Sequence, residues 1–161
     1  MPDIATVTRN YIGDYLSAIS PVAYKLMGTG VVQVDESPNT KIDKTAFVNN
    51  ANSTGTVTGY ERVFPFDVQM RTGEDATMLL VAIGHDSKTG SDAELFYVRA
   101  DLYRAPSAGT YPARRFRVTA EITSIEGAGT EIVHIKGNLH QLGDYSEGDF
   151  NPTTLAFTTD A

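Results

Sequence analysis

Cysteine and tryptophan are both absent from this sequence of 161 residues. The lack of cysteine rules out disulfides, thiolate zinc sites and thiol catalysis, and it agrees with folding in a reducing compartment. The lack of tryptophan and the scattering of the eight tyrosines disfavour a sugar-binding platform or a lipocalin-like pocket. Several classes of enzyme and binding protein are therefore disfavoured from the outset.

Long apolar runs are also missing. No stretch approaches the roughly 20 apolar residues that a membrane-spanning helix needs. Residues 1–20 contain an early acid and neither a basic region nor a continuous apolar stretch, so they do not predict a secretory signal. We expect a single domain over residues 1–161, made in the cytoplasm and without a membrane segment.

Positive charge is scarce relative to negative charge. The chain has 13 lysines and arginines against 20 aspartates and glutamates, which gives a net charge of -7. Because proteins that bind nucleic acid neutralise phosphates with basic side chains, this balance disfavours a protein that reads or coats nucleic acid. It is compatible with a wall past which nucleic acid slides, since like charges repel.

Strand patterns dominate what is present. Alternating apolar and polar residues predict strands over segments 22–34, 60–70, 94–104, 114–124, 130–142 and 153–158. Tyr60 and Phe66 share the apolar face of their segment, where Pro65 indicates an edge position or a bulge. Gly28 and Gly30 indicate a bulge or a close backbone approach within the first segment.

One segment, 74–84, has helical character. Thr72 precedes it as a candidate N-cap, acids occupy its first turn, and Gly84 is a stop signal. We therefore expect one helix of about three turns.

Residues 36–59 form a polar connection rich in Asn, Thr and Gly. Connections beyond about 12–15 residues are uncommon in compact domains unless they bind something or are disordered. Phe47 and Val48 lie within it, and a flexible loop would not need these apolar side chains. Two interpretations remain open: an arm that becomes ordered against a partner subunit, or a plain mobile loop.

Four potential metal ligands or proton carriers lie close together near the end of the sequence: His140, Asp144, Glu147 and Asp149. His134 lies on the same side of its strand as His140 but about 20 Å from it, too far to share a metal. A calcium loop also fails, because Leu155 occupies the position of the final glutamate. We interpret residues 144–149 as a turn.

Other catalytic motifs are missing from the sequence. It has no G-x-S-x-G elbow, no Walker loop and no H-E-x-x-H, and Gly28-Thr29-Gly30 lacks the third glycine of a dinucleotide site. Glu121 and Glu131 could act as acid and base, but such pairs are expected on a solvated face in a chain this acidic. We predict a protein that is not an enzyme and that uses no cofactor or metal.

Five phrases, taken together, resemble the major tail tube proteins of long-tailed (siphovirus-type) bacteriophages and prophages of Gram-positive bacteria. They cover most of the chain in the order of the family, and they are YKLMGTGV (24–31), TGYERVFPFD (58–67), SKTGSDAELFYVRADLY (87–103), YPARRFRVTAEITSIEG (111–127) and IKGNLHQLGDYSEGDFNPTTLAFT (135–158).

The resemblance implies a mainly β fold: a twisted β-sandwich or partial barrel with one flanking α-helix and a long extended loop. Six copies would join edge to edge into a hexameric ring, and rings would stack into a hollow tube in the tail of the virion. Unpaired sheet edges agree with this, because a closed ring of subunits satisfies them. The implied parts are an N-terminal segment (1–20), an inter-subunit arm (36–59) and a C-terminal turn and strand (144–161).

The resemblance also implies partners. Further copies of the chain would form the tube, the tail tape measure, tail terminator and distal tail proteins would join it, and viral DNA would pass through a negatively charged lumen without specific binding. Two other classes stay open: the tube protein of a bacterial injection or secretion device, and a small β-barrel hydrolase or ligand-binding module.

Candidate residues are those that leave the core. Phe47 and Val48 are predicted to dock on an adjacent subunit. Arg115 and Arg117 point outward from a strand, where they form either an intersubunit salt-bridge row or a solvated face. The candidates for the lumen are the outward acids Glu61, Asp67 and Glu121.

Overall fold

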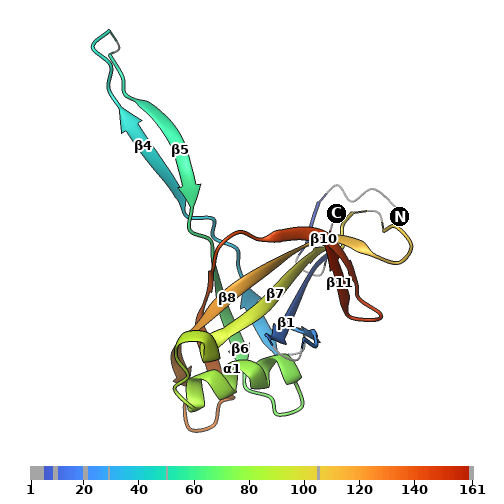
Figure 1. Cartoon of the computed structure of the whole chain (residues 1–161). Helices are drawn as coiled ribbons and strands as arrows, with labels where there is room; N and C mark the ends of the chain where they lie inside the picture. Colours follow the sequence, from blue (N-terminus) through green and yellow to red (C-terminus); the bar gives the residue numbers. More distant parts are fainter. Residues whose placement is uncertain are drawn as a thin grey trace.

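Antiparallel β-sheet makes up most of the molecule (Figure 1). The structure, a computed structural model, describes residues 6–8, 11–19, 22–28, 30–49, 51–104 and 106–159. Thr29 and parts of the N-terminal segment therefore lie outside the described residues. The strands are β1 (Ile12–Ala18), β2 (Lys25–Leu26), β3 (Val31–Val34), β4 (Thr40–Thr45), β5 (Thr54–Tyr60), β6 (Val63–Gln69), β7 (Glu94–Asp101), β8 (Tyr111–Glu126), β9 (His134–Gln141), β10 (Ser146–Asn151) and β11 (Ala156–Thr159). The helical elements are α1 (Asp75–His85) and the short 3₁₀ helix η2 (Gly90–Ala93).

The main sheet is a curled half-barrel with the strand order β2-β1-β7-β8-β9-β6-β3. β8 is long enough to pair twice along one edge: its first part pairs with β10 and its second part with β9. β10 in turn pairs with β11. A separate two-stranded sheet, β4-β5, projects from the body at the end opposite α1 (Figure 1). The mainly β fold with one flanking helix is confirmed.

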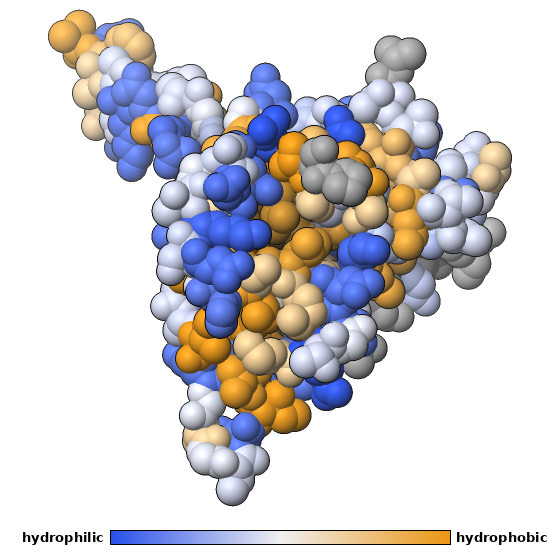
Figure 2. Space-filling model, turned by 60° about the horizontal axis from the view of Figure 1, so that its bottom comes forward, coloured by the Kyte–Doolittle hydropathy of each residue, from blue (hydrophilic) through white to orange (hydrophobic). Residues whose placement is uncertain are grey.

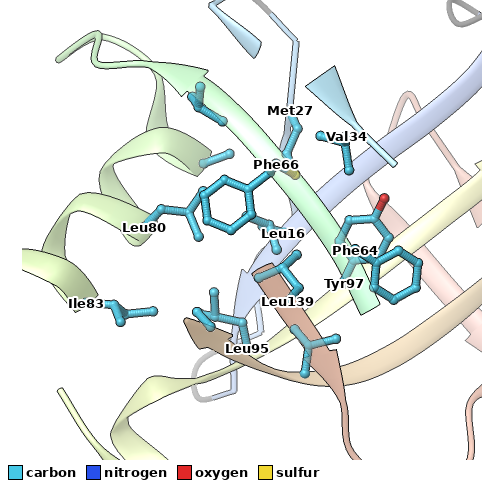
Figure 3. Packing of buried hydrophobic residues seen from close by; sticks show 14 of the residues in the cluster. Leu16, Met27, Val34, Phe64, Phe66, Leu80, Ile83, Leu95, Tyr97 and Leu139 are labelled. Carbon is cyan, nitrogen blue, oxygen red and sulfur yellow. The ribbon is translucent and has the colours of Figure 1, made fainter. Parts of the chain in front are cut away.

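The main hydrophobic core lies between α1 and the face of the sheet that it covers (Figure 3). Leu80 and Ile83 point from the helix toward side chains of the sheet, among them Phe66 and Leu95. Farther along this face Phe64 stacks on Tyr97, with ring centroids 4.7 Å apart. Burying large aromatic rings against each other contributes strongly to such a core.

A second, smaller core lies on the other face, where β10 and β11 cover the sheet. Its buried residues are Tyr15, Tyr24, Val98, Ala100, Ala113 and Phe150. β7 therefore contributes to both cores, with Tyr97 on one side and Val98 on the other. Burial on both faces explains why apolar residues run without alternation from Leu95 to Val98 in this strand.

The helix begins and ends later than its sequence pattern indicates. Its N-cap is Glu74, without a side-chain hydrogen bond, so the prediction of Thr72 as the cap was wrong. Gly84 lies inside the helix rather than at its end. A Cβ atom at Gly84 would lie 3.0 Å from Cγ2 of Ile122, so glycine here permits close packing of helix and sheet.

Segment 22–34 is two short strands, β2 and β3, not one. The prediction of a bulge or a close backbone approach is met by a register shift between Val31 and Gln33 in the pairing of β3 with β6. Gly30 just before it has a φ of +86°. A left-handed residue at this position turns the chain away from a single extended path.

Two expectations for segment 60–70 were also wrong. Tyr60 ends β5 and is exposed, so it does not share the apolar face of β6. Pro65 lies in an interior strand, between β9 and β3, where it pairs with Asn138. Proline is tolerated because β3 has ended at this level: only the backbone N–H of Asp35 lies opposite, and it donates to the carbonyl of Pro65.

Residues 146–149 belong to strand β10, so the interpretation of 144–149 as a turn was wrong for most of its length. Gly148 explains the error. A Cβ atom at this position would overlap the carbonyl oxygen of Thr158, so the glycine serves a close approach of β10 to β11. The turn itself lies one step earlier, where Gly143 adopts a φ of +67°.

Candidate functional site

The β4-β5 hairpin, hereafter the arm, is the most exposed apolar feature of the described chain. Its tip, which is hydrophobic in the space-filling view (Figure 2), carries Phe47 and Val48, whose relative exposures are 53% and 110%. Along the arm, Ile42 pairs with Val57 across the two strands, and both side chains are exposed. An isolated two-stranded hairpin is marginally stable in water. The arm thus has regular structure, while its own chain leaves more than half of each of these apolar residues exposed.

The root of the arm is tied by backbone pairing. Ser37 and Val63 exchange two backbone hydrogen bonds, of 2.8 and 2.9 Å. One step farther out, the amide side chain of Asn39 donates to the carbonyl of Glu61 at 3.0 Å. The exposed carboxylate of Glu61 lies 2.6 Å from Nζ of Lys41.

A group of charged residues, hereafter the arm-root cluster, lies just below this pairing. It consists of Glu36, Arg62, Arg99 and Arg114. Arg114 of β8 donates to both carboxylate oxygens of Glu36, at 2.8 and 2.9 Å. Nε of Arg62 lies 2.7 Å from Oε2 of Glu36, and Nε of Arg99 lies 3.6 Å from Oε1. One carboxylate therefore meets three guanidinium groups.

The cluster continues into the sheet through a second carboxylate. Nη1 of Arg99 lies 3.7 Å from Oδ1 of the buried Asp14 on β1, and it donates to the hydroxyl of Tyr97 at 3.3 Å. The Tyr97 hydroxyl donates in turn to Asp14. Buried charges are stable only when they are paired and hydrogen-bonded, and this chain of contacts pairs them from the arm root to the far strand β1.

The electrostatics of the cluster follow from its partners. Burial disfavours the charge of Glu36, but the hydrogen bond from Arg114 and the charges of Arg114, Arg99 and Arg62 together lower its pKa below the ordinary value. Burial likewise opposes the charge of Arg114, yet the hydrogen bond to Glu36 leaves its pKa raised. Both members of the pair are therefore held in their charged forms.

Sequence patterns did not reveal this cluster. Glu36 and Arg62 flank the arm almost symmetrically, and this was the one available signal. Arg99 and Arg114 reach the same place through strand pairing, since they lie opposite each other on β7 and β8. That register is a long-range property of the sheet.

The three lumen candidates do not form one group. Asp67 and Glu121 lie on the same face of the sheet, opposite the main core, on strands separated by β9. Glu61 lies apart from them at the arm root. Each of the first two acids contacts a histidine of β9: Asp67 lies 2.8 Å from Nδ1 of His134, and Glu121 lies 3.4 Å from Nε2 of His140.

The two arginine candidates have partners within their own chain. Arg117 donates to Glu94 at 3.1 Å. The guanidinium of Arg115 lies over the rings of Phe96 and Phe157, 4.8 and 5.2 Å from their centroids. Their proposed intersubunit role stays a prediction.

In the described part of the chain, neither the surface clefts nor the clusters of His, Asp and Glu side chains form a catalytic centre. Within residues 6–8, 11–19, 22–28, 30–49, 51–104 and 106–159, no group of three or more His, Asp or Glu side chains is arranged to hold a metal ion. A cleft of about 790 Å³ lies between the arm root and the loop before β10, lined in part by Tyr60, Arg62 and Tyr145. In the same residues, no helix is long and apolar enough to cross a membrane.

No protein-family model and no curated protein sequence matches this chain. Solved structures do match this chain. The chain superposes on the SPP1 tail tube protein, from a hybrid solid-state NMR and cryo-EM structure, with a TM-score of 0.68 at 10% sequence identity over 88% of this chain and 78% of that one. The chain has the fold of a phage tail tube protein.

A second solved structure extends the likeness. A chain of the anti-feeding prophage baseplate, from a six-fold symmetrised cryo-EM structure, matches with a TM-score of 0.50 at 6% identity, over 91% of this chain and 97% of that one. At these identities the likeness establishes the tail tube fold and leaves the assembly, the partners and the roles of individual residues to be argued from the chain itself.

Proposed function

We propose that this protein is a non-enzymatic structural subunit of a phage tail tube. In this proposal six copies form a ring, and rings stack into a hollow conduit for viral DNA in the tail of a siphovirus-type phage or prophage of a Gram-positive bacterium. The observation that carries the proposal is the shared fold with the SPP1 tail tube protein over 88% of the chain. The exposed arm supports it independently.

The arm would connect neighbouring subunits. Phe47 and Val48 expose apolar surface at its tip, and burial of apolar area against another copy would stabilise the contact. The hairpin reaches well beyond the body (Figure 1), so one copy cannot cover its own tip. A subunit held by several neighbours needs only moderate affinity at each contact.

The open margins of the sheet would close the ring. β3 ends the sheet on one side and has no strand beyond it among the described residues, while the two-residue β2 ends the other. Unpaired strand edges favour pairing with another chain. A closed ring of identical subunits satisfies every such edge in its plane.

The lumen would be lined by the polar face of the sheet that carries Asp67 and Glu121. Each acid there contacts a histidine of β9. Repulsion by the net charge of -7 would prevent DNA from being retained. The tape measure, terminator and distal tail proteins are the expected partners in the virion, after synthesis in the host cytoplasm.

Electron microscopy of the purified protein over a concentration series tests the proposal. Hollow filaments of uniform width, or six-fold rings, are expected. A variant that lacks residues 41–53 is expected to give folded monomers or rings that do not elongate. A chain that stays monomeric at high concentration and with its tail partners, or that turns over a substrate, would contradict the proposal.

A second candidate is the tube of a prophage-related bacterial injection device. The likeness to the anti-feeding prophage baseplate chain favours it. The geometry of the subunit would be the same and the cargo would differ. Filaments isolated from native particles distinguish the two, because the tail tube contains or releases DNA whereas the injection tube contains protein.

A further inference from the structure

The arm meets the body through two adjacent segments of chain, at residues 36–39 and 61–63. Ser37 pairs with Val63 at this point, and Val63 is in turn tied to the sheet by its pairing with His140 of β9. Beyond this point the arm is a two-stranded ribbon with both faces exposed. Such ribbons twist and bend easily, since no third layer supports them. Side-chain contacts at the root therefore add to this backbone pairing in setting the direction in which the arm points.

Glu36 is the residue placed to do this. It directly precedes the pairing at the arm root, and its carboxylate is held by side chains of three separate segments: Arg62 after the arm, Arg99 of β7 and Arg114 of β8. β7 and β8 are central strands of the sheet. Arg62 further lies over the rings of Phe116 and Tyr145, with its guanidinium carbon 5.7 and 5.5 Å from their centroids.

The arrangement tolerates little displacement. If the arm root tilted away from the sheet, the carboxylate of Glu36 would leave Arg114, whose two hydrogen bonds to it are directional. The three guanidinium groups would then lose the counter-charge that they share, although Arg99 keeps Asp14 at 3.7 Å. Removing a counter-charge from a site that is at least partly buried is unfavourable. The charges thus favour one orientation of the arm over a range of others.

We propose that Glu36 is the positioning residue of the arm, and that the arm-root cluster fixes the arm in its projecting direction before any partner binds. The inference rests on the proposed function for what the arm contacts, namely a second copy of the chain. A fixed arm reduces the conformational freedom lost on docking, so the cluster promotes growth of the tube without touching the neighbouring subunit.

The absence of cysteine in the sequence makes a direct test possible. Cysteines replacing the exposed Val48 at the arm tip and Thr153 in the turn before β11 accept spin labels, and double electron-electron resonance then measures the distance between tip and body. The labelled full chain is diluted with unlabelled chain so that distances are intramolecular. We expect a narrow distribution for the parent and a distribution broadened at least twofold for Glu36→Gln.

Glu94→Gln is the matched control. Glu94 is also a carboxylate paired with an arginine, its side chain is also 18% exposed, and it lies far from the arm. Its variant should keep the narrow distribution. Arg62→Gln is the second variant, which leaves the Glu36–Arg114 pair in place and decides the question if Glu36→Gln does not fold; broadening is expected here as well.

The outcomes separate this inference from the proposed function. A parent distribution that is already broad, or folded Glu36→Gln and Arg62→Gln proteins with the parent's width, would overturn the positioning role whether or not the protein forms tubes. Broadening of both variants supports it even if microscopy shows no tubes. Where tubes form, Glu36→Gln should raise the critical concentration for elongation severalfold relative to Glu94→Gln.

Discussion

Glu36 and Arg62 stand on either side of the arm in the sequence and meet at its root, with Nε of Arg62 2.7 Å from Oε2 of Glu36. The chain leaves the sheet after one residue, makes a long hairpin, and returns to the other. Their contact closes the loop that the arm forms. Arg114 then ties this closed loop to the sheet through two hydrogen bonds to Glu36.

The first prediction concerns the stability of this junction. Glu36→Gln should lower the free energy of unfolding by about 2 kcal/mol, since it removes the counter-charge shared by the buried Arg99 and the partly buried Arg62 and Arg114. Glu94→Gln should cost less than about 1 kcal/mol, because its partner Arg117 is largely exposed and solvated. Urea unfolding of the unassembled chains gives both values. Equal losses of unfolding free energy in the two variants would contradict the assigned difference between the arginines that Glu36 and Glu94 contact.

The second prediction is a pH dependence. The hydrogen bond and charges of the arginines lower the pKa of Glu36 in the folded chain despite its burial, whereas the unfolded chain titrates near 4.3. The stabilisation is therefore fully present above about pH 5 and is lost as the pH falls below 4 toward the lowered pKa. The difference in unfolding free energy between parent and Glu36→Gln should stay constant from pH 6 to 8 and shrink in acid. A difference that grows on acidification would show that the sign is wrong.

The third prediction tests close packing in the sheet. A Cβ atom at Gly137 of β9 would overlap the carbonyl oxygen of Glu121 on β8. Gly137→Ala should thus destabilise the fold by roughly 2–3 kcal/mol, as overpacking does. Gly73, in a turn, has no neighbour within 4 Å of its virtual Cβ, and Gly73→Ala serves as the control with little effect. Thermal unfolding of the two variants compares them, and similar midpoints would refute the close approach.

Much of the sheet could be predicted from alternation alone. The alternation of apolar and polar residues in segment 114–124 predicts the apolar face of β8, and Phe116 and Val118 on this face are fully buried. The alternation is informative here because one face meets the main core and the other meets water. For β7 the pattern is weaker, since both faces are buried.

The arm was predicted as a connection, but its two strands and strand β10 were not. Both faces of the arm are exposed, so no alternation of burial selects its strands, and its threonines and glycines suit loops as well. In β10, Gly148 resembles a turn residue in sequence but serves a close contact with Thr158. The arm-root cluster escaped prediction because Glu36 and Arg114 meet only after the sheet has formed.

The last prediction concerns the tip of the arm. Val48 is completely exposed and Phe47 is largely so, which means that neither contributes much to the stability of the single chain. Replacing both with serine should leave the unfolding midpoint within about 1 °C of the parent, since exposed surface positions change stability by less than about 0.5 kcal/mol. The same change removes the apolar surface that we propose is buried between subunits, and filaments should become shorter or disappear in electron micrographs. Replacing Thr56 with serine, on the shaft of the arm, is the control that should leave filament growth intact. Filaments of normal length from the double variant at its parent's critical concentration would place the subunit contact elsewhere on the molecule.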